Sequence, residues 1–119
     1  MPRVIHFEIP AQNLRRAMNF YQGIFGWEME PWPDNPDYVQ IRTGPDKEPG
    51  IHGAIIRREG PVVNTVQVES VDETAARVVQ TGGEIVVPKQ PIPQVGWLIY
   101  CQDTEGNVFG LVELDDEAT

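Results

Sequence analysis

The order of predicted secondary-structure elements occurs twice along the chain, and this repeat is the strongest constraint on its fold. In the first half, "VIHFEI" alternates like a strand, "LRRAMNFYQGIF" carries the apolar stripe of a helix, and three strand-like segments follow. In the second half, "VNTVQVES" leads into the helix "ETAARVVQTGG", and "EIVVP", "GWLIYCQ" and "NVFGLVEL" follow as strands. Neither half could bury its apolar face alone, so we expect the two halves to fold together.

The repeat therefore predicts a single domain over residues 1–119 that contains two modules. The first module spans about residues 1–59 and the second about 60–114. An acidic tail at 115–119 follows, and we expect it to be a solvated chain end.

Local signals predict where the helices begin and end. Asn13 is expected to cap the first helix, Gly26 to end it in a left-handed conformation, and Asp72 to cap the second helix. The proline-rich stretches "PDNP" and "PKQPIPQ" predict loops between strands.

Charge and cysteine content exclude some classes of function. The formal net charge is -9, from 18 acidic and 9 basic side chains, whereas a nucleic-acid partner requires a basic surface. The same charge favours a cationic small ligand. The single cysteine, Cys101, fits a reducing compartment, and no apolar run is long enough to cross a bilayer. We therefore expect a cytoplasmic protein without nucleic-acid or membrane partners.

The first strand places two ionisable groups on one side. Side chains alternate between the faces of a strand, so Ile5, Phe7 and Ile9 share a core face while His6 and Glu8 share the other. The neighbouring carboxylate is expected to favour protonated His6. A charged binding clamp, a general acid and base, and a solvent-exposed ion pair all remain open.

Two segments resemble the vicinal oxygen chelate superfamily, which includes glyoxalase I, bleomycin-resistance proteins and extradiol dioxygenases. They are "HFEIPAQNLRRAMNFYQGIFGWEM" near the start and "DTEGNVFGLVE" near the end. The resemblance implies an α+β fold of two tandem βαβββ modules, which form a half-barrel sheet around a cavity. It also implies a homodimer.

The resemblance further implies four positions for metal ligands, one on the first and one on the last strand of each module. The first-strand positions fall on His6 and on Thr65 (or Val66), and the last-strand positions fall on Gly53 and Gly110. Only His6 can bind a transition metal. We therefore expect no cofactor; a divalent metal is disfavoured, and His6 is its ligand if one binds.

A different metal site would combine His6, Glu8 and His52 as two histidines and a carboxylate. Alignment of the two halves matches His52 with Phe109, which predicts that His52 lies on the helix-facing side of its strand. This prediction disfavours the triad.

Alternation also predicts which side chains line the cavity. Polar groups set among aromatic rings are typical of a small-molecule site, and Tyr38 and Trp97 hold matching positions that could sandwich a flat ligand. Ile99 and Cys101 share the face of Trp97 in this prediction. The alternatives are a solvated sheet face for the polar residues and close packing for the glycines. The predicted ligand-binding residues are His6, Glu8, Tyr38, Gln40, Arg42, Gly53, Thr65, Gln67, Trp97 and Gly110.

Three functions remain open on this basis. The first is a glyoxalase/bleomycin-resistance-like protein that binds a small molecule in a metal-free cavity. The second is a glyoxalase-related lyase, isomerase or dioxygenase that uses a divalent metal or acid–base chemistry by His6 and Glu8. The third is an interaction module whose cavity has no catalytic role.

Overall fold

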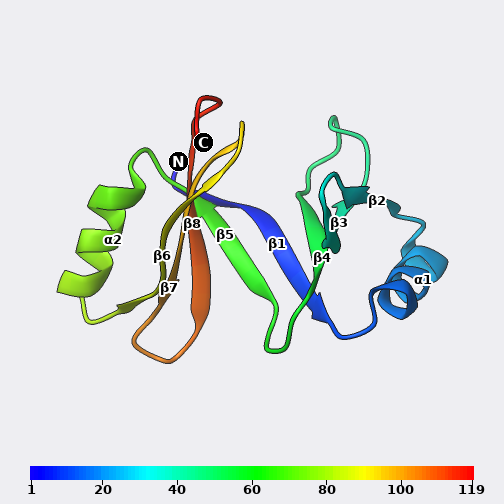
Figure 1. The fold of residues 1–119 in the computed structure, drawn as a ribbon, viewed down its shortest axis with the longest axis horizontal. Coiled ribbons are helices and arrows are strands. Elements are labelled where there is room, and N and C mark those ends of the chain that lie inside the picture. The colour runs from blue at the N-terminus through cyan, green and yellow to red at the C-terminus, as the bar shows by residue number, and fades with distance from the viewer. The chain divides into compact units, whose positions relative to one another are not determined.

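The computed structural model describes residues 1–119 and contains the predicted repeat (Figure 1). The first set of elements is β1 (Arg3–Ala11), α1 (Leu14–Phe25), β2 (Glu28–Trp32), β3 (Asn35–Arg42) and β4 (His52–Arg57). The second set is β5 (Val63–Gln67), α2 (Val71–Gln80), β6 (Glu84–Ile92), β7 (Gly96–Gln102) and β8 (Val108–Leu114). The order βαβββ therefore occurs twice, and this prediction is confirmed.

The chain divides into two compact units. We call residues 6–62 the N-terminal unit, and residues 63–119 together with residues 1–5 the C-terminal unit. In each unit the middle strands are antiparallel, and the first strand pairs with the last in parallel. The strand order is β2-β3-β4-β1 in the N-terminal unit and β6-β7-β8-β5 in the C-terminal unit.

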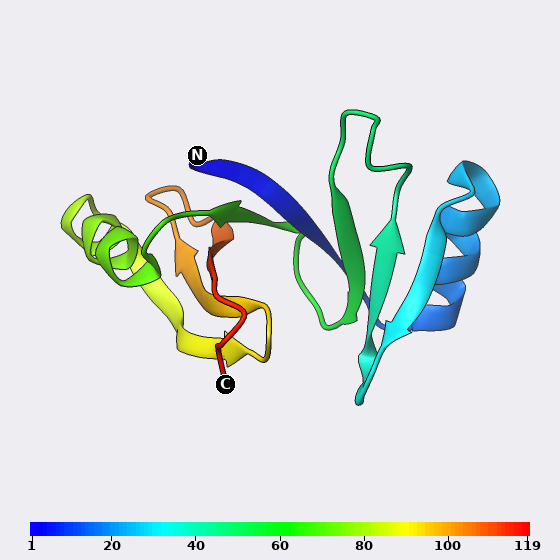
Figure 2. The same cartoon turned by 90° about the horizontal axis from the view of Figure 1, so that it is seen from above.

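One helix covers one face of the sheet in each unit, as both views show (Figures 1 and 2). Side chains from α1, β1, β3 and β4 form the core of the N-terminal unit, including Leu14, Val39, Ile41 and Ile55. Side chains from α2 and its own strands form the second core. We call the other side of each sheet its helix-free face. Neither helix is long and apolar enough to cross a membrane.

The helix ends agree with the sequence analysis at α1 but not at α2. The side chain of Asn13 accepts a hydrogen bond from the Arg16 amide, and Gly26 ends α1 at φ 70°. The predicted cap of α2 is wrong, because Ser70 holds that position and accepts from the Glu73 amide at 3.1 Å. Asp72 lies in the first turn and pairs with Lys89 at 2.9 Å.

Two segments are more ordered than predicted. "PKQPI" belongs to β6 rather than to a loop, because β6 continues to Ile92 opposite β7 through two register shifts. The tail at 115–119 also contacts the rest of the chain. The Gln94 amide donates to the carbonyl of Ala118, and Ala118 is only 3 % exposed. The expectation of a solvated end is therefore wrong at Ala118.

Candidate functional site

Strand register brings polar side chains into rows on the helix-free face of the N-terminal unit. Glu30 on β2 lies opposite Gln40 on β3, Gln40 lies opposite Ala54 on β4, and Ala54 lies opposite Glu8 on β1. One step along the strands, Glu28 lies opposite Arg42, and His52 lies opposite His6. These residues alternate with the core residues of the same strands, so they lie on the opposite face from α1.

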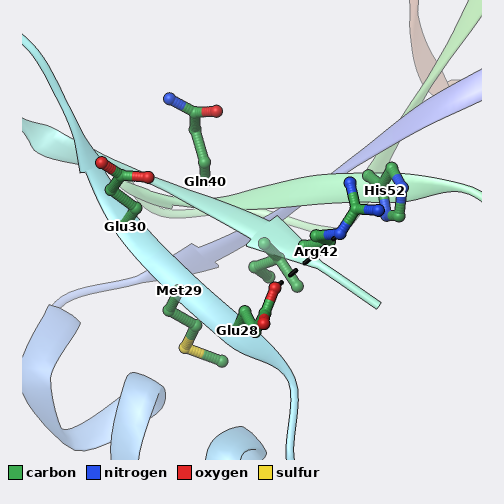
Figure 3. Close-up of a pocket in the computed structure, with 7 residues that line it drawn as sticks. Glu28, Met29, Glu30, Gln40, Arg42 and His52 are labelled. Carbon is green, nitrogen blue, oxygen red and sulfur yellow. Dashed lines mark ion pairs between the residues drawn. The ribbon is translucent and has the colours of Figure 1, made fainter. Parts of the chain in front are cut away.

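A pocket of about 440 Å³ lies on this unit (Figure 3). Glu28 and Arg42 form an ion pair across it, with 3.7 Å between Oε2 and Nε. Gln40 and Arg42, both predicted to bind a ligand, are among its lining residues. The full lining is Glu28, Met29, Glu30, Gln40, Ile41, Arg42 and His52.

Glu30 and Gln40 are the lining groups whose polar ends carry no hydrogen bond or ion pair to the protein. Their side chains extend to the same side of the paired strands β2 and β3 (Figure 3). A carboxylate beside a carboxamide can accept hydrogen bonds from a cationic or amine-bearing ligand. The sequence analysis did not predict Glu30. The alternation of polar Glu30 with apolar Met29 along β2 would have indicated that the Glu30 side chain faces away from the core.

His52 lies on the helix-free face, so its predicted helix-facing position is wrong. In the parallel pair β1–β4, His52 lies opposite His6, whereas Gly110 lies opposite Thr65 in the parallel pair β5–β8. The alignment of the two halves was therefore displaced by one residue on the last strand, and a displacement of one residue exchanges the faces.

Both ring nitrogens of His52 are used within the protein. The Thr43 amide donates to Nδ1 at 3.0 Å, which leaves the proton on Nε2, and Nε2 donates to Asp46 Oδ1 at 3.2 Å. Arg42 binds the same carboxylate oxygen at 3.2 Å. The hydrogen bonds from His52 and Arg42 hold the pKa of Asp46 below its ordinary value. His52 therefore attaches the 43–51 loop to β4 and has no free nitrogen for a ligand.

His6 has a hydrogen-bond partner that the sequence did not reveal. The hydroxyl of Tyr38 lies 3.1 Å from His6 Nε2, and the edge of Trp32 packs on the Tyr38 ring at 5.6 Å between centroids. Burial lowers the pKa of His6. The expectation that Glu8 would favour protonated His6 is therefore wrong, because the loss of hydration on burial disfavours the charged ring.

Glu8 is a buried carboxylate, only 5 % exposed. Arg58 Nη2 lies 3.8 Å from its Oε1, and the same guanidinium donates through Nη1 to the carbonyls of Glu59 and Pro61. Burial, and after it the charge of Glu8, raises the pKa of Tyr38 well above its ordinary value. Arg58 was not among the predicted site residues, because it follows the end of β4 and alternation gives no face for it.

Gly53 lies on the wrong face for the predicted metal or ligand position. A Cβ built there would lie 2.5 Å from the Phe7 carbonyl oxygen and 2.6 Å from the Phe7 ring, which packs on the α1 side. The glycine therefore allows Phe7 to approach β4 closely. This agrees with close packing, the alternative given for the glycines in the sequence analysis. Ala54 holds the corresponding place on the helix-free face, opposite Glu8.

In the C-terminal unit, Thr65 and Gly110 lie opposite each other on neighbouring strands. Thr65 is 4 % exposed, and a Cβ on Gly110 would lie 2.8 Å from its Oγ1. Both residues, and Gln67 two positions along, alternate with side chains that pack under α2, so they lie on the helix-free face as predicted. The space beside Gly110 is filled by the Thr65 side chain.

The predicted face of Trp97, Ile99 and Cys101 is wrong. Ile99 and Cys101 are buried in the core under α2, and Trp97 packs against that core. The Trp97 indole donates to Asp115 Oδ2 at 3.1 Å, and Lys89 Nζ lies 4.9 Å from the ring centroid. Trp97 therefore lies on the helix-covered face of its unit and Tyr38 on the helix-free face of its own, so the matching positions on which the predicted ligand sandwich rested are wrong.

The residues at the four implied metal positions do not fit a metal. Nε2 of His6 is engaged by Tyr38, Gly53 faces the helix side, and Thr65 fills the space beside Gly110. No group of three or more His, Cys, Asp or Glu side chains is arranged to hold an ion.

Comparison with known proteins gives one family match and many structural matches. Residues 3–44 match the family described as bleomycin resistance protein-like, N-terminal. No curated protein matches the chain.

The structural matches extend over nearly the whole chain. A methylmalonyl-CoA epimerase in complex with methylmalonyl-CoA and NH4+ is 15 % identical, with a TM-score of 0.73 over 100 % of this chain and 99 % of that one. A Streptomyces coelicolor methylmalonyl-CoA epimerase in complex with 2-nitronate-propionyl-CoA is 16 % identical, with a TM-score of 0.72 over 100 % and 99 %.

A third match is a glyoxalase/bleomycin resistance protein/dioxygenase superfamily member from Vibrio splendidus 12B01. It is 16 % identical, with a TM-score of 0.68 over 97 % of this chain and 100 % of that one. Identities this low show the fold. The resemblance to the vicinal oxygen chelate superfamily is thereby confirmed: residues 3–44 carry a bleomycin-resistance-like signature, and the whole chain has the glyoxalase/bleomycin-resistance fold.

Proposed function

We propose that the protein binds a small molecule on the helix-free face of its N-terminal unit, without a metal. The observation that carries this proposal is the pocket of about 440 Å³, in which Glu30 and Gln40 have no partner in the protein. Polar groups left unpaired at a pocket wall gain binding energy when a ligand supplies the missing partners.

The ligand we propose carries a cationic or amine group. Glu28 is already paired with Arg42, and Arg42 is paired with Asp46, so Glu30 is the carboxylate available for a new charge-assisted hydrogen bond. The net charge of -9 also favours the approach of a cation.

The proposal also covers the oligomeric state, the location and the partners of the protein. We infer a homodimer from the resemblance, and a reducing, cytoplasmic location from the single buried Cys101. The acidic surface supports the absence of nucleic-acid partners, and we propose no membrane partner.

Thermal shift with two matched probes tests the ligand chemistry. Benzamidinium, which is flat and cationic, should raise the melting temperature, while benzamide, which has the same shape without the charge, should not. Glu30→Gln should abolish the shift, and Glu105→Gln, which removes the same charge in a turn of the C-terminal unit, should retain it. A shift that survives Glu30→Gln, or an equal response to benzamide, would show the proposed site to be wrong.

A related enzyme remains the second candidate, and one observation favours an isomerase over a lyase or dioxygenase. Glu8 is a buried carboxylate beside Tyr38 and Arg58, and two of the structural neighbours are epimerases. A buried carboxylate can remove a proton from an acidic C–H bond, and epimerisation is completed when a second donor delivers a proton to the opposite face. The corresponding test is deuterium exchange into methylmalonyl-CoA in D2O, followed by NMR. Exchange that Glu8→Gln abolishes would support this candidate over simple binding.

A further inference from the structure

The two histidines of the chain differ in how many of their ring nitrogens have a hydrogen-bond partner in the protein. His52 uses both nitrogens, with Nδ1 accepting from the Thr43 amide and Nε2 donating to Asp46. His6 uses one, because Nε2 contacts the Tyr38 hydroxyl at 3.1 Å and Nδ1 has no partner in the protein. A neutral imidazole carries one proton, so the partner at one nitrogen decides which nitrogen is the donor.

The direction of the His6–Tyr38 hydrogen bond follows from the groups around it. A tyrosine hydroxyl can donate or accept, but His6 Nε2 is the one protein acceptor that the Tyr38 hydroxyl contacts. The loss of hydration, and after it the charge of Glu8, opposes ionisation of Tyr38, so the hydroxyl keeps its proton, and Nε2 is the acceptor to which it can donate. Burial likewise keeps the His6 ring neutral. The ring proton of His6 then resides on Nδ1.

We propose that Tyr38 is a positioning residue that holds His6 in the Nδ1–H form, so that His6 meets a bound ligand as a hydrogen-bond donor. This inference rests on the proposed binding site, and it adds a requirement to the ligand. His6 does not line the pocket itself, but it lies on the same helix-free face, opposite the lining residue His52 on the neighbouring strand. A ligand group that extends from the pocket to His6 is an acceptor, such as a carbonyl, carboxylate or phosphate oxygen, whereas the group at Glu30 and Gln40 is a donor. A ligand with both kinds of group, such as a zwitterion, meets both requirements.

The same geometry distinguishes two roles that the sequence left open for His6. With Nε2 occupied and Nδ1 protonated, the ring has no lone pair free to accept a proton or to bind a metal. A neutral ring in this form can therefore donate a hydrogen bond, and the roles of general acid and general base do not fall to it.

Long-range 1H–15N correlation spectra of the imidazole rings test the assignment at neutral pH without any ligand. We expect His6 in the Nδ1–H form and His52, the internal control, in the Nε2–H form. Tyr38→Phe keeps the ring but removes the hydroxyl, and it should shift His6 toward the Nε2–H form that free imidazole side chains favour, while His52 stays unchanged. His6 in the Nε2–H form in the unmodified protein, or no change in Tyr38→Phe, would overturn the proposal.

Acetate and methylammonium, added in parallel to the same sample, test the ligand class. Acetate should move the His6 Nδ1 resonance and methylammonium should not, and Tyr38→Phe should reduce the acetate response at least severalfold. A response to methylammonium instead of acetate would overturn the acceptor assignment. Failure of benzamidinium to bind at Glu30 would count against the proposed function, and it would leave the tautomer result intact.

Discussion

At the scale of single residues, the charge of Glu8 contributes to the raised pKa of Tyr38. Its carboxylate is buried, and its charge is the second cause, after burial, of the raised pKa of Tyr38. Glu8→Gln should therefore lower the pKa of Tyr38 while leaving it above its ordinary value. Tyrosine 13Cζ shifts followed through an alkaline titration measure this, with Glu30→Gln as the control that leaves Tyr38 unchanged. No change in Glu8→Gln would show that burial alone sets the pKa.

Residue-level predictions succeeded where alternation within one strand was enough. His6, Glu8, Tyr38, Gln40 and Arg42 all lie on the helix-free face as the period of two requires. Whether they bind a ligand stays a prediction.

The residue-level predictions that failed depended on aligning one half of the chain with the other. His52, Gly53 and Trp97 were assigned faces from that alignment, and a displacement of one residue puts each on the other face. Arg58 and the Tyr38–His6 hydrogen bond depend on side-chain reach across strands, which no sequence period encodes.

At the scale of elements, the contact between β5 and β8 leaves no room for a side chain at position 110. A Cβ there would lie 2.8 Å from Thr65 Oγ1 and 3.3 Å from its Cγ2. Gly110→Ala should therefore lower the free energy of unfolding by about 1–3 kcal/mol, the usual cost of overpacking.

Two further variants serve as controls for Gly110→Ala. Gly23→Ala on α1 meets nothing within 4 Å and should raise stability by up to about 1 kcal/mol, because alanine favours a helix. In a Thr65→Ala background the Gly110→Ala penalty should largely vanish, since the remaining Cβ lies at 3.4 Å. Urea unfolding of the unmodified protein, the three single variants and the double variant measures both effects, and a penalty that persists without the Thr65 side chain would refute the steric account.

The 43–51 loop is a second element-scale feature, and its attachment depends on pH. Hydrogen bonds from His52 and Arg42 lower the pKa of Asp46 in the folded protein. Such a group stabilises the fold above its unfolded pKa, and this contribution is lost as the pH falls through the lower folded value.

Asp46→Asn should accordingly lower the melting temperature at pH 7, and the difference from the unmodified protein should shrink below about pH 4, where carboxylates protonate. Thermal unfolding of both proteins across this range measures the difference, in which Asp103 and Asp115 cancel because both proteins contain them. A difference independent of pH would mean that Asp46 acts through packing and not through charge.

At the scale of the whole molecule, the sequence was enough to predict the double βαβββ order. Each element has a clear period, and the two capped helices separate the strands. The extent of β6 and the attachment of Ala118 could not be predicted. Proline-rich and acidic composition predicts a loop and a loose end, whereas pairing with β7 and a backbone hydrogen bond to Gln94 decide the outcome.

The central claim is that this molecule binds its ligand without a metal, and metal content tests it most directly. Protein purified without a histidine tag should contain no stoichiometric nickel, zinc, manganese or iron, and an excess of these ions should leave its melting temperature unchanged. A stoichiometric metal that is lost in His6→Ala would contradict the claim.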